Sequence, residues 1–198
     1  MPAKLSPFHQ AIDFIAYIER LKSVIRKNAL HDGSRPENTA EHSWHAALSA
    51  ILLAPYANFP VDQDRVARML LIHDLVEIEA GDTFVYDMQE LAGQDAAESR
   101  AAQEIFRRLP ADQGLALKAL WEEFEARQTP EAMFAKAVDR FLPMYSNLRN
   151  GGSSWVPHAI SQSQVRELAE IIREGSITLW EWVDRELTQA EQDGLLLP

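Results

Sequence analysis

Apolar residues recur at helical spacing along almost the whole chain. Phe14, Ile18, Leu21 and Ile25 follow one another at steps of three and four residues, with charged residues between them, and this pattern is typical of an amphipathic helix. No segment shows convincingly the strict alternation of apolar and polar residues that marks a half-buried strand. Internal repeats and low-complexity segments are also missing from the sequence. The pattern therefore predicts an all-α fold in a single domain.

Capping and breaking residues divide this pattern into separate helices. Asn38, followed three residues later by Glu41, matches a capping box at a helix start, and Thr129 before Pro130 provides an N-cap and a first-turn proline. Pro143 is expected to kink the helix that contains it. The expected helices span residues 14–26, 38–54, 62–80, 95–109, 112–127, 130–148, 163–173 and 176–191, with a loop over 82–93.

The strongest break in the chain is the Gly-Gly-Ser-Ser segment at residues 151–154. It separates a core of about residues 14–150 from C-terminal helices over residues 160–191. The part after the break is too short to form an independent domain. We therefore expect these last helices to pack on the core, so that residues 1–198 form one domain.

Charge and composition exclude several classes of function. The 198 residues include 30 acidic and 19 basic side chains, a formal net charge of −11, and no Cys. This acidity is unfavourable for binding duplex nucleic acid or an anionic membrane surface, because basic residues recognise both. The lack of Cys excludes disulfides, thiolate nucleophiles and Cys-ligated metals. No apolar run approaches the roughly 18 residues of a membrane span, and the N-terminus lacks a signal-peptide pattern, so a cytoplasmic protein is expected.

Two ionisable residues, His73 and Asp74, stand inside an otherwise apolar helical segment. Burying charged groups without partners is costly, and a divalent cation would compensate both groups at once. His73 and Glu77 lie four residues apart and would share one face of a continuous helix. His42 and Asp139 lie in the apolar stripes of two other expected helices. These residues are therefore candidates for one shared metal site.

Two His and two Asp from three helices form a mixed nitrogen and oxygen ligand set. Such a set suits Mn, Fe, Co, Ni or Zn rather than Ca or Mg alone. Coordination positions left open would admit water and a substrate oxygen. Each residue taken alone has an ordinary alternative: His73 as a hydrogen-bonded core residue, for example, or Asp139 in a surface ion pair with Arg140.

This spaced set resembles the signature of the HD-domain metal-dependent phosphohydrolases. Three segments carry the likeness: Arg35–Ser43, His73–Glu77 followed by Gly81 and Asp82, and Ala137–Asp139. Together they look like the 5′-deoxynucleotidase branch of that family, and the resemblance extends over about residues 14–148. It implies an HD-domain helical bundle. It also implies hydrolysis of nucleoside 5′-monophosphates, with deoxyribonucleotides preferred, to nucleoside and phosphate.

The resemblance also implies roles for individual residues. It assigns four ligands of the divalent metal: His42, His73, Asp74 and Asp139. Glu77 would engage the nucleophilic water and the phosphate, and Asp82 would contact the substrate near the leaving oxygen or the sugar. In some relatives these two residues, with the backbone at the position of Thr83, hold a second cation such as Mg.

Two arginines are candidate phosphate ligands. Arg26 falls where the bacterial enzyme of this branch has a substrate-binding Arg, and Arg35 is a second cation able to neutralise phosphoryl oxygens. In the bacterial enzyme a Trp directly follows its Arg and is associated with the selection of deoxyribose. Lys27 stands at that position here, so the sugar preference is open.

Other functions are compatible with the same fold. A metal-bound module that senses a nucleotide without hydrolysing it would use the same ligands, although the presence of Glu77 and Asp82 favours an enzyme. An oxidative di-iron HD enzyme needs more metal-ligating His than the sequence can place. A purely structural bundle gives no reason for the buried charges at His73, Asp74 and Asp139. Relatives form homodimers, so a homodimer is expected.

Overall fold

Helices make up most of the chain in the computed structural model, which describes residues 5–198 without the side chains at positions 88 and 90. The α-helices of this part are α1 (Pro7–Ile18), α2 (Thr39–Leu53), α3 (Gln63–Ile72), α4 (Glu77–Ala80), α5 (Met88–Leu91), α6 (Gln94–Phe106), α7 (Ala111–Ala126), α8 (Pro130–Arg149), α9 (Gln162–Gly175) and α10 (Ile177–Gln192). The shorter elements are the 3₁₀ helices η1 (Glu19–Ser23), η2 (Ala54–Tyr56) and η3 (His73–Val76) and the strands β1 (Ile25–Ala29) and β2 (Pro36–Asn38).

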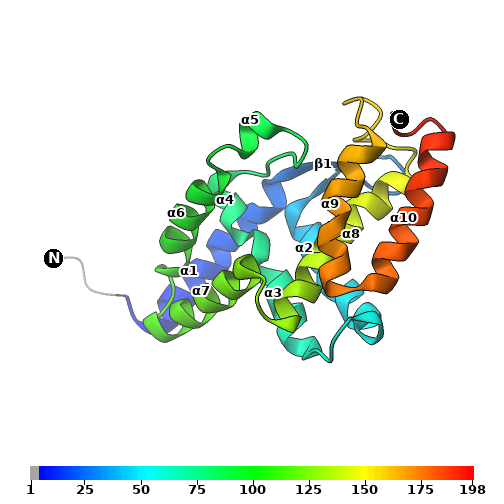
Figure 1. Ribbon diagram of the computed structural model, residues 1–198. Coiled ribbons are helices and arrows are strands. Elements are labelled where there is room, and N and C mark those ends of the chain that lie inside the picture. Colours follow the sequence, from blue (N-terminus) through cyan, green and yellow to red (C-terminus); the bar gives the residue numbers. More distant parts are fainter. Residues whose placement is uncertain (1–4) are drawn as a thin grey trace.

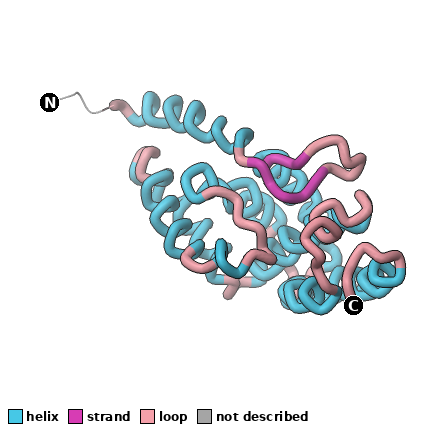
Figure 2. The backbone as a smooth tube through the Cα atoms, turned by 90° about the horizontal axis from the view of Figure 1, so that it is seen from above, coloured by secondary structure: helices cyan, strands magenta, loops and turns pink. Residues whose placement is uncertain are grey.

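α8 packs against α2, α3, α7, α9 and α10, and α1 and α6 lie on the other side of the molecule (Figure 1). α9 packs along α8 and α10 packs along α9, while α2 and α3 pack on each other and on α8. α7 contacts both α3 and α8, and α6 contacts α7, α4 and η3. The antiparallel hairpin of β1 and β2 follows α1 at the edge of this helical arrangement (Figure 2).

Buried apolar side chains form two clusters. The larger cluster lies among α2, α3, α8, α9 and α10 and includes Leu70. The smaller one lies among α1, η3, α6 and α7 and includes Leu75. His73 and Asp74 stand between these two leucines in the chain. The charged pair therefore lies where the chain passes from one cluster to the other.

The predicted helix starts at residues 38 and 130 are confirmed. The Asn38 side chain accepts a hydrogen bond from the backbone N–H of Glu41, and the Glu41 carboxylate accepts one from the N–H of Asn38, which completes the capping box. Thr129 Oγ1 accepts a hydrogen bond from the N–H of Ala132, and Pro130 begins α8. Local side-chain chemistry thus determines where α2 and α8 begin.

The prediction of one helix over residues 14–26 was wrong at both ends. α1 begins earlier, at Pro7, with Ser6 as its N-cap. After η1 the chain becomes strand β1 at Ile25, which pairs antiparallel with β2. The expectation of a chain without strands is corrected by this hairpin. Its strands are too short to show an alternating pattern, and the turn between them contains Gly33 at a φ of 69°, a conformation that glycine adopts readily.

The continuous helix predicted over residues 62–80 is broken at its charged centre. α3 ends at Ile72, η3 follows, and α4 ends before Gly81. Side chains three residues apart align in a 3₁₀ helix, so Asp74 and Glu77 lie on the same side. The α-helical register expected between His73 and Glu77 is replaced by this tighter turn. The loop predicted over residues 82–93 contains the short helix α5.

The hairpin is anchored to α8 at a proline. Pro143 lies inside α8, and its carbonyl oxygen accepts hydrogen bonds from the side-chain amides of Asn28 on β1 (3.1 Å) and Asn147 (3.0 Å). Asn28 is two residues from Arg26, so this anchor fixes the strand that carries Arg26 against α8. Pro143 thus provides a backbone acceptor for the hairpin, while the kink expected at Pro143 stays a prediction.

The C-terminal helices pack directly on α8. At Gly175, at the end of α9, a Cβ atom would lie 2.4 Å from the carbonyl oxygen of Met133 and 2.7 Å from Cβ of Ala137, so this close approach requires glycine. The division into a core of about residues 14–150 and appended helices remains a prediction. Within residues 5–198, none of the helices is both long and apolar enough for a membrane crossing.

Candidate metal centre

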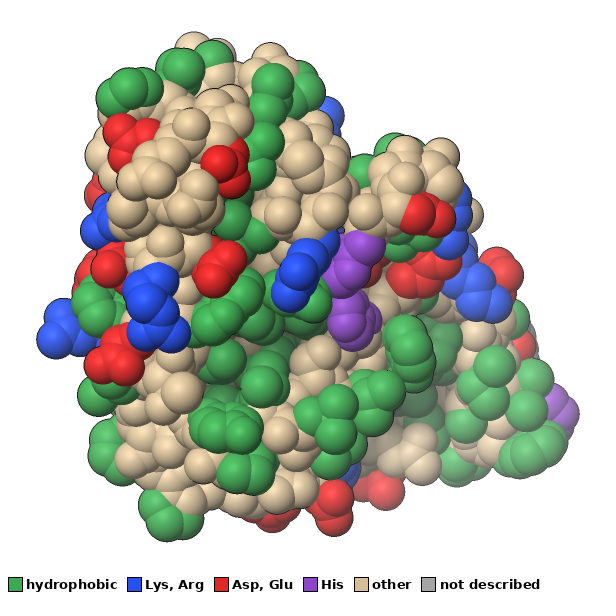
Figure 3. Space-filling view, turned by 90° about the vertical axis from the view of Figure 1, so that its right-hand side faces the viewer, with side chains coloured by type: hydrophobic (Ala, Val, Ile, Leu, Met, Phe, Trp, Pro, Cys, Tyr) green, Lys and Arg blue, Asp and Glu red, His purple; other side chains and the backbone are tan. Residues whose placement is uncertain are grey.

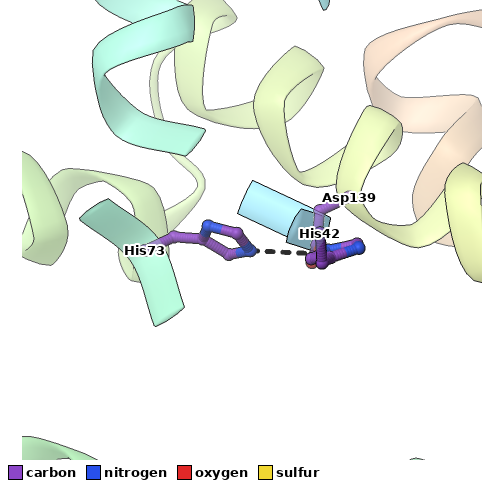
Figure 4. A group of neighbouring side chains, drawn as sticks. All are labelled: His42, His73 and Asp139. Atoms are coloured by element: carbon purple, nitrogen blue, oxygen red, sulfur yellow. Dashed lines mark hydrogen bonds and ion pairs between the residues drawn. The ribbon is translucent and has the colours of Figure 1, made fainter. Parts of the chain in front are cut away.

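Three side chains from distant parts of the sequence converge at one buried point (Figure 4). His42 comes from α2, His73 from η3 and Asp139 from α8. One nitrogen of each His and one oxygen of Asp139 all lie within 4.8 Å of one another. Nε2 of His42 lies 3.0 Å and Nε2 of His73 lies 3.3 Å from Asp139 Oδ1. The three residues are 1%, 2% and 8% exposed, so they form a buried donor set of two nitrogens and one oxygen.

Neighbouring groups orient the two imidazole rings. His73 Nδ1 donates a hydrogen bond of 2.8 Å to the carbonyl oxygen of Leu70. Because a carbonyl only accepts, Nδ1 carries a proton and Nε2 of a neutral ring has its lone pair free. His42 Nδ1 lies 3.6 Å from Glu37 Oε2, which favours the same orientation in the second ring. Both Nε2 atoms are therefore available as metal ligands.

Asp74 lies at the edge of this donor set. Its Oδ1 is 3.1 Å from His73 Nε2, while its Oδ2 accepts a hydrogen bond of 3.0 Å from Arg26 Nη1. The four residues predicted as ligands are thus brought to one place. Unlike Asp139, Asp74 also accepts a hydrogen bond from an arginine.

Arg26 reaches from β1 into a group of four carboxylates. Besides Asp74, its Nη1 lies 3.7 Å from Asp82 Oδ1 and 4.0 Å from Glu77 Oε1, and its Nε lies 3.9 Å from Glu37 Oε2. Its side chain is only 12% exposed. One cation facing four partly buried acids leaves an excess of negative charge, which a bound metal ion would balance.

Two of the buried acids are held in the charged form. Burial alone would raise the pKa of Asp74, but His73 and Arg26 lower it to about 2. Burial acts in the same direction on Asp139, yet its hydrogen bonds with His42 and His73 hold its pKa well below the usual range. Both carboxylates are therefore ionised at neutral pH, as metal ligands must be.

The pKa values of Glu77 and Asp82 are shifted in the opposite direction. Burial raises the pKa of Glu77 well above its usual value, and the negative charge of Asp74 adds to this effect. Burial also raises the pKa of Asp82, although Arg26 opposes it. Thr39 Oγ1 donates a hydrogen bond of 2.9 Å to Glu77 Oε2 and positions that carboxylate. A raised pKa brings a carboxyl group towards the range useful for proton transfer at neutral pH.

A cavity of about 170 Å³ adjoins this centre. Asp74, Glu77 and Asp139 contribute to its wall, as do Asp82 and Thr83 from the segment after α4. Most of the residues assigned to metal, water or substrate therefore face one space. Further lining comes from Lys136 and Arg140 on α8 and from polar and aromatic residues of other segments: Asn28, Tyr86, Glu98 and Trp155.

The two predicted arginines have different places. Arg26 lines the cavity, and Lys27, which follows it on β1, lines the cavity with an exposed side chain. Arg35 is not among the lining residues. Its Nη1 and Nη2 donate hydrogen bonds of 2.8 Å and 2.6 Å to the two carboxylate oxygens of Glu41 on the surface. The structure therefore brings Arg26, and not Arg35, to the centre.

Three charged residues at the centre were not assigned by sequence analysis: Glu37, Lys136 and Arg140. Glu37 lies between His42 and Arg26, and its place in a segment that resembles the family was its only signal. Lys136 Nζ lies 3.6 Å from Asp139 Oδ2, and its spacing of three residues from an expected ligand could have identified it. In the described residues no ion pair joins Asp139 to Arg140, so that alternative is not observed.

The donor set fits a divalent transition metal. Imidazole nitrogen and carboxylate oxygen together are the ligands of such ions. Burial alone would lower the pKa of His73, but Asp74 and Asp139 raise it to about 10. Surroundings that stabilise the protonated His73 ring this strongly also stabilise a metal cation at the same place. The chemistry of the residues thus agrees with a metal site.

Comparison with known proteins identifies the family of the chain. Residues 18–180 match the HD domain family. The fold matches the crystal structure of a predicted metal-dependent phosphohydrolase from Magnetospirillum magnetotacticum MS-1 with a TM-score of 0.93 and 44% sequence identity, covering 98% of this chain and 97% of that one. A conserved hypothetical protein from Pyrococcus furiosus shares the fold, with a TM-score of 0.61 and 24% identity over 88% of this chain and 99% of that one.

The curated relatives are less similar in sequence. The chain is 29% identical to human 5′-deoxynucleotidase HDDC2 over 130 residues, which make up 65% of this chain and 62% of the human protein. The similarity therefore spans less than two thirds of that relative. The chain is also 28% identical to 5′-deoxynucleotidase Ent638_2835 from Enterobacter sp. strain 638, over 72% of this chain and 76% of that protein. The chain thus belongs to the HD domain family, among its metal-dependent phosphohydrolases, with 5′-deoxynucleotidases as distant relatives.

Proposed function

We propose that this protein is a phosphomonoesterase that hydrolyses nucleoside 5′-monophosphates, and deoxyribonucleotides preferentially, to nucleoside and phosphate. The observation that carries this proposal is the convergence of His42, His73 and Asp139 beside a cavity whose wall also contains Glu77 and Asp82. The names of the distant relatives support the substrate class, and the name of the similar crystal structure supports the reaction class.

In this proposal one divalent cation, Mn, Co, Fe, Ni or Zn, binds four residues: His42, His73, Asp74 and Asp139. When bound, such a cation supplies Lewis acidity, which makes water more acidic and neutralises charge on phosphoryl oxygens. The hydrogen bond from His73 to Leu70 and the carboxylate of Glu37 beside His42 hold the rings in a ligating orientation.

The remaining residues act on the water and the ester. Hydrolysis forms a bond between the water oxygen and phosphorus and breaks the bond between phosphorus and the 5′-oxygen. Glu77 accepts a proton from the attacking water, and Asp82 donates a proton to the leaving 5′-oxygen, so that no net proton is gained by the chain. Arg26 stabilises the charge on the equatorial phosphoryl oxygens.

A second cation and the sugar of the substrate would contact the same part of the cavity wall. As an alternative to proton donation by Asp82, the ionised carboxylates of Glu77 and Asp82, with the backbone of Thr83, would hold a second cation, such as Mg, that arrives with the phosphate. Lys27 stands beside Arg26 where a relative has Trp, so the contact with the sugar differs from that relative. We place the 2′-position of the sugar near Lys27.

A panel of nucleotides tests this function directly. Phosphate release from each deoxyribonucleoside and ribonucleoside 5′-monophosphate is measured with the purified full chain and added Mn²⁺ or Co²⁺. We expect release from several of them, with the deoxy forms faster. No release from any member of the panel would refute the proposal, and tight nucleotide binding without release would identify a nucleotide-sensing module instead.

We also propose that the protein forms a homodimer through α2. Trp44, Leu48, Leu52 and Tyr56 follow one another at four-residue spacing along α2 and η2 and are 62%, 43%, 68% and 52% exposed. Hydrophobic side chains also gather on the side of the molecule where α10 lies (Figure 3). A continuous exposed apolar stripe of this kind is typical of a protein interface, and a symmetric dimer would cover it on both chains.

A further inference from the structure

Arg140 lines the cavity from α8. In residues 5–198 no hydrogen bond, ion pair or ring contact involves its side chain, and its Nε atom is buried without an acceptor. A donor that loses water and gains no acceptor destabilises the protein by itself. An arginine in this state, in a chain with 30 acidic residues, points to a ligand that supplies the missing acceptor.

The other cationic side chains of the cavity are engaged or solvated. Arg26 faces four carboxylates. Lys136 lies within 4 Å of two carboxylates and over the ring of Phe124. Lys27 is exposed to water. Among the described cations of the cavity wall, Arg140 is therefore the partly buried one that forms no ion pair with a described residue.

Tyr86 contributes a second donor to the same wall. Its hydroxyl oxygen accepts a hydrogen bond of 3.3 Å from Trp155 Nε1, and its own proton has no acceptor among the described residues. Burial raises the pKa of Tyr86 to about 12, against the opposing charge of Arg140. The hydroxyl therefore stays protonated at neutral pH, and two donors without acceptors line one cavity.

We propose that Arg140, with the hydroxyl of Tyr86, binds the phosphate group of the substrate. The inference rests on the proposed function, because the phosphate is the anionic group of a nucleoside monophosphate. A guanidinium presents paired N–H groups that match two phosphoryl oxygens. Arg140 directly follows Asp139 on α8 and both line the cavity, so a phosphate beside Asp139 lies within reach of the arginine side chain.

Binding of inorganic phosphate to the Mn²⁺-loaded full chain tests this assignment without requiring turnover. Isothermal titration calorimetry compares wild type with Arg140→Gln, Arg140→Lys and Tyr86→Phe. Arg149→Gln is the matched control, because Arg149 is an exposed arginine of the same helix that lies over the ring of Tyr145. Thermal melting of each variant checks that it is folded, and Arg140→Lys keeps the charge if the glutamine variant does not fold.

We expect Arg140→Gln to weaken phosphate binding about 10- to 100-fold, the effect typical of a lost charge-assisted hydrogen bond. Arg140→Lys should recover part of this loss, and Tyr86→Phe should weaken binding several-fold. Binding of deoxyadenosine, which has no phosphate, should be the same in Arg140→Gln as in wild type. The control Arg149→Gln should match wild type in every measurement.

Three results would overturn the assignment. Two of them are phosphate affinity of Arg140→Gln within about twofold of wild type, and no phosphate binding by wild type at all. A loss of deoxyadenosine binding with phosphate binding intact would overturn it as well, because Arg140 would then bind the nucleoside. Failure of the proposed function looks different. In that case wild type releases no phosphate from the nucleotide panel, while its affinity for inorganic phosphate still depends on Arg140.

Discussion

His42 Nε2 lies 3.0 Å from Asp139 Oδ1, although 97 residues separate the two in the chain. The contact joins α2 to α8 in the interior of the bundle, and His73 reaches the same carboxylate oxygen from η3. Burying two imidazoles around one carboxylate is energetically unfavourable unless a cation lies between them.

Removal of a metal ligand should remove the metal and the activity together. His73→Ala or Asp139→Ala takes away one donor of a three-atom cluster in which all atoms lie within 4.8 Å. We expect bound metal, measured by elemental analysis of the purified protein, to fall from about one ion per chain to near zero, with loss of phosphate release. His9→Ala, on the exposed part of α1, is the control. Wild-type metal content in both ligand variants would contradict the assignment.

Glu77→Gln should separate metal binding from turnover. The substitution keeps the size of the side chain and the hydrogen bond from Thr39, but an amide cannot accept a proton from water. Metal content should stay at the wild-type level while kcat falls by about 10²- to 10⁴-fold, the range typical of a lost general base. Turnover within a few-fold of wild type would show that another group takes the proton.

Glu37→Gln tests a residue that positions a ligand rather than binding the metal. Glu37 Oε2 lies 3.6 Å from His42 Nδ1 and 3.9 Å from Arg26 Nε. Without its negative charge, the His42 ring is held less firmly, and metal affinity should fall about 10- to 100-fold. Competition with a chelator of known affinity measures this change. Glu104→Gln, an exposed acid of α6 that pairs with Arg107, should leave the affinity unchanged, and equal affinity in both variants would exclude the positioning role.

Glu123 should make the stability of the fold dependent on pH. It accepts hydrogen bonds from Arg65 on α3 and from Thr129, the N-cap of α8, and the bond with Arg65 lowers its pKa below the usual 4.5. Since the pKa is lower in the folded state, the stabilisation is present above about pH 4.5 and is lost as the pH falls through the folded-state pKa. Glu123→Gln should therefore reduce the free energy of unfolding by about 0.5 kcal/mol at pH 7.

Urea unfolding at a series of pH values measures this effect. The difference between wild type and Glu123→Gln should shrink steadily as the solution becomes more acidic than pH 4.5. Glu181→Gln, an exposed acid on α10, should show no such trend. A constant difference over the whole series would mean that the ion pair does not stabilise the fold through the charge of Glu123.

Leu48→Glu should prevent dimer formation. Leu48 lies in the middle of the exposed stripe on α2, and a charge there would lose its hydration in a dimer interface. Light scattering coupled to gel filtration should give the mass of two chains for wild type and of one chain for the variant. Leu115→Glu, at an exposed leucine of α7, is the control and should stay dimeric. A single-chain mass for wild type would refute the dimer.

Much of the candidate site was visible in the sequence because its signals are local. A charged pair at His73 and Asp74 inside an apolar segment is anomalous wherever the segment packs, and the capping residues at Asn38 and Thr129 determine helix starts through bonds within four residues. The helical periodicity predicted the fold class for the same reason. His42 and Asp139 could be grouped with His73 because each stands on an apolar stripe that must face the core.

Other features depend on contacts between segments that no local pattern contains. The hairpin exists because residues 25–29 meet residues 36–38 and because Asn28 bonds to the carbonyl of Pro143 on α8. Only that placement turns Arg26 towards the acids, while Arg35 is bound to Glu41 on the surface.

By itself, the sequence determined the helical class, the helix starts at Asn38 and Thr129 and the residues with metal-binding chemistry, since periodicity and capping act over a few residues. The tertiary structure alone decided the 3₁₀ turn at His73, the choice between the two arginines and the unpartnered state of Arg140. Those outcomes depend on which distant side chains come within hydrogen-bond distance. Packing of the whole chain determines that, because electrostatic and hydrogen-bond energies change over distances of a few ångströms.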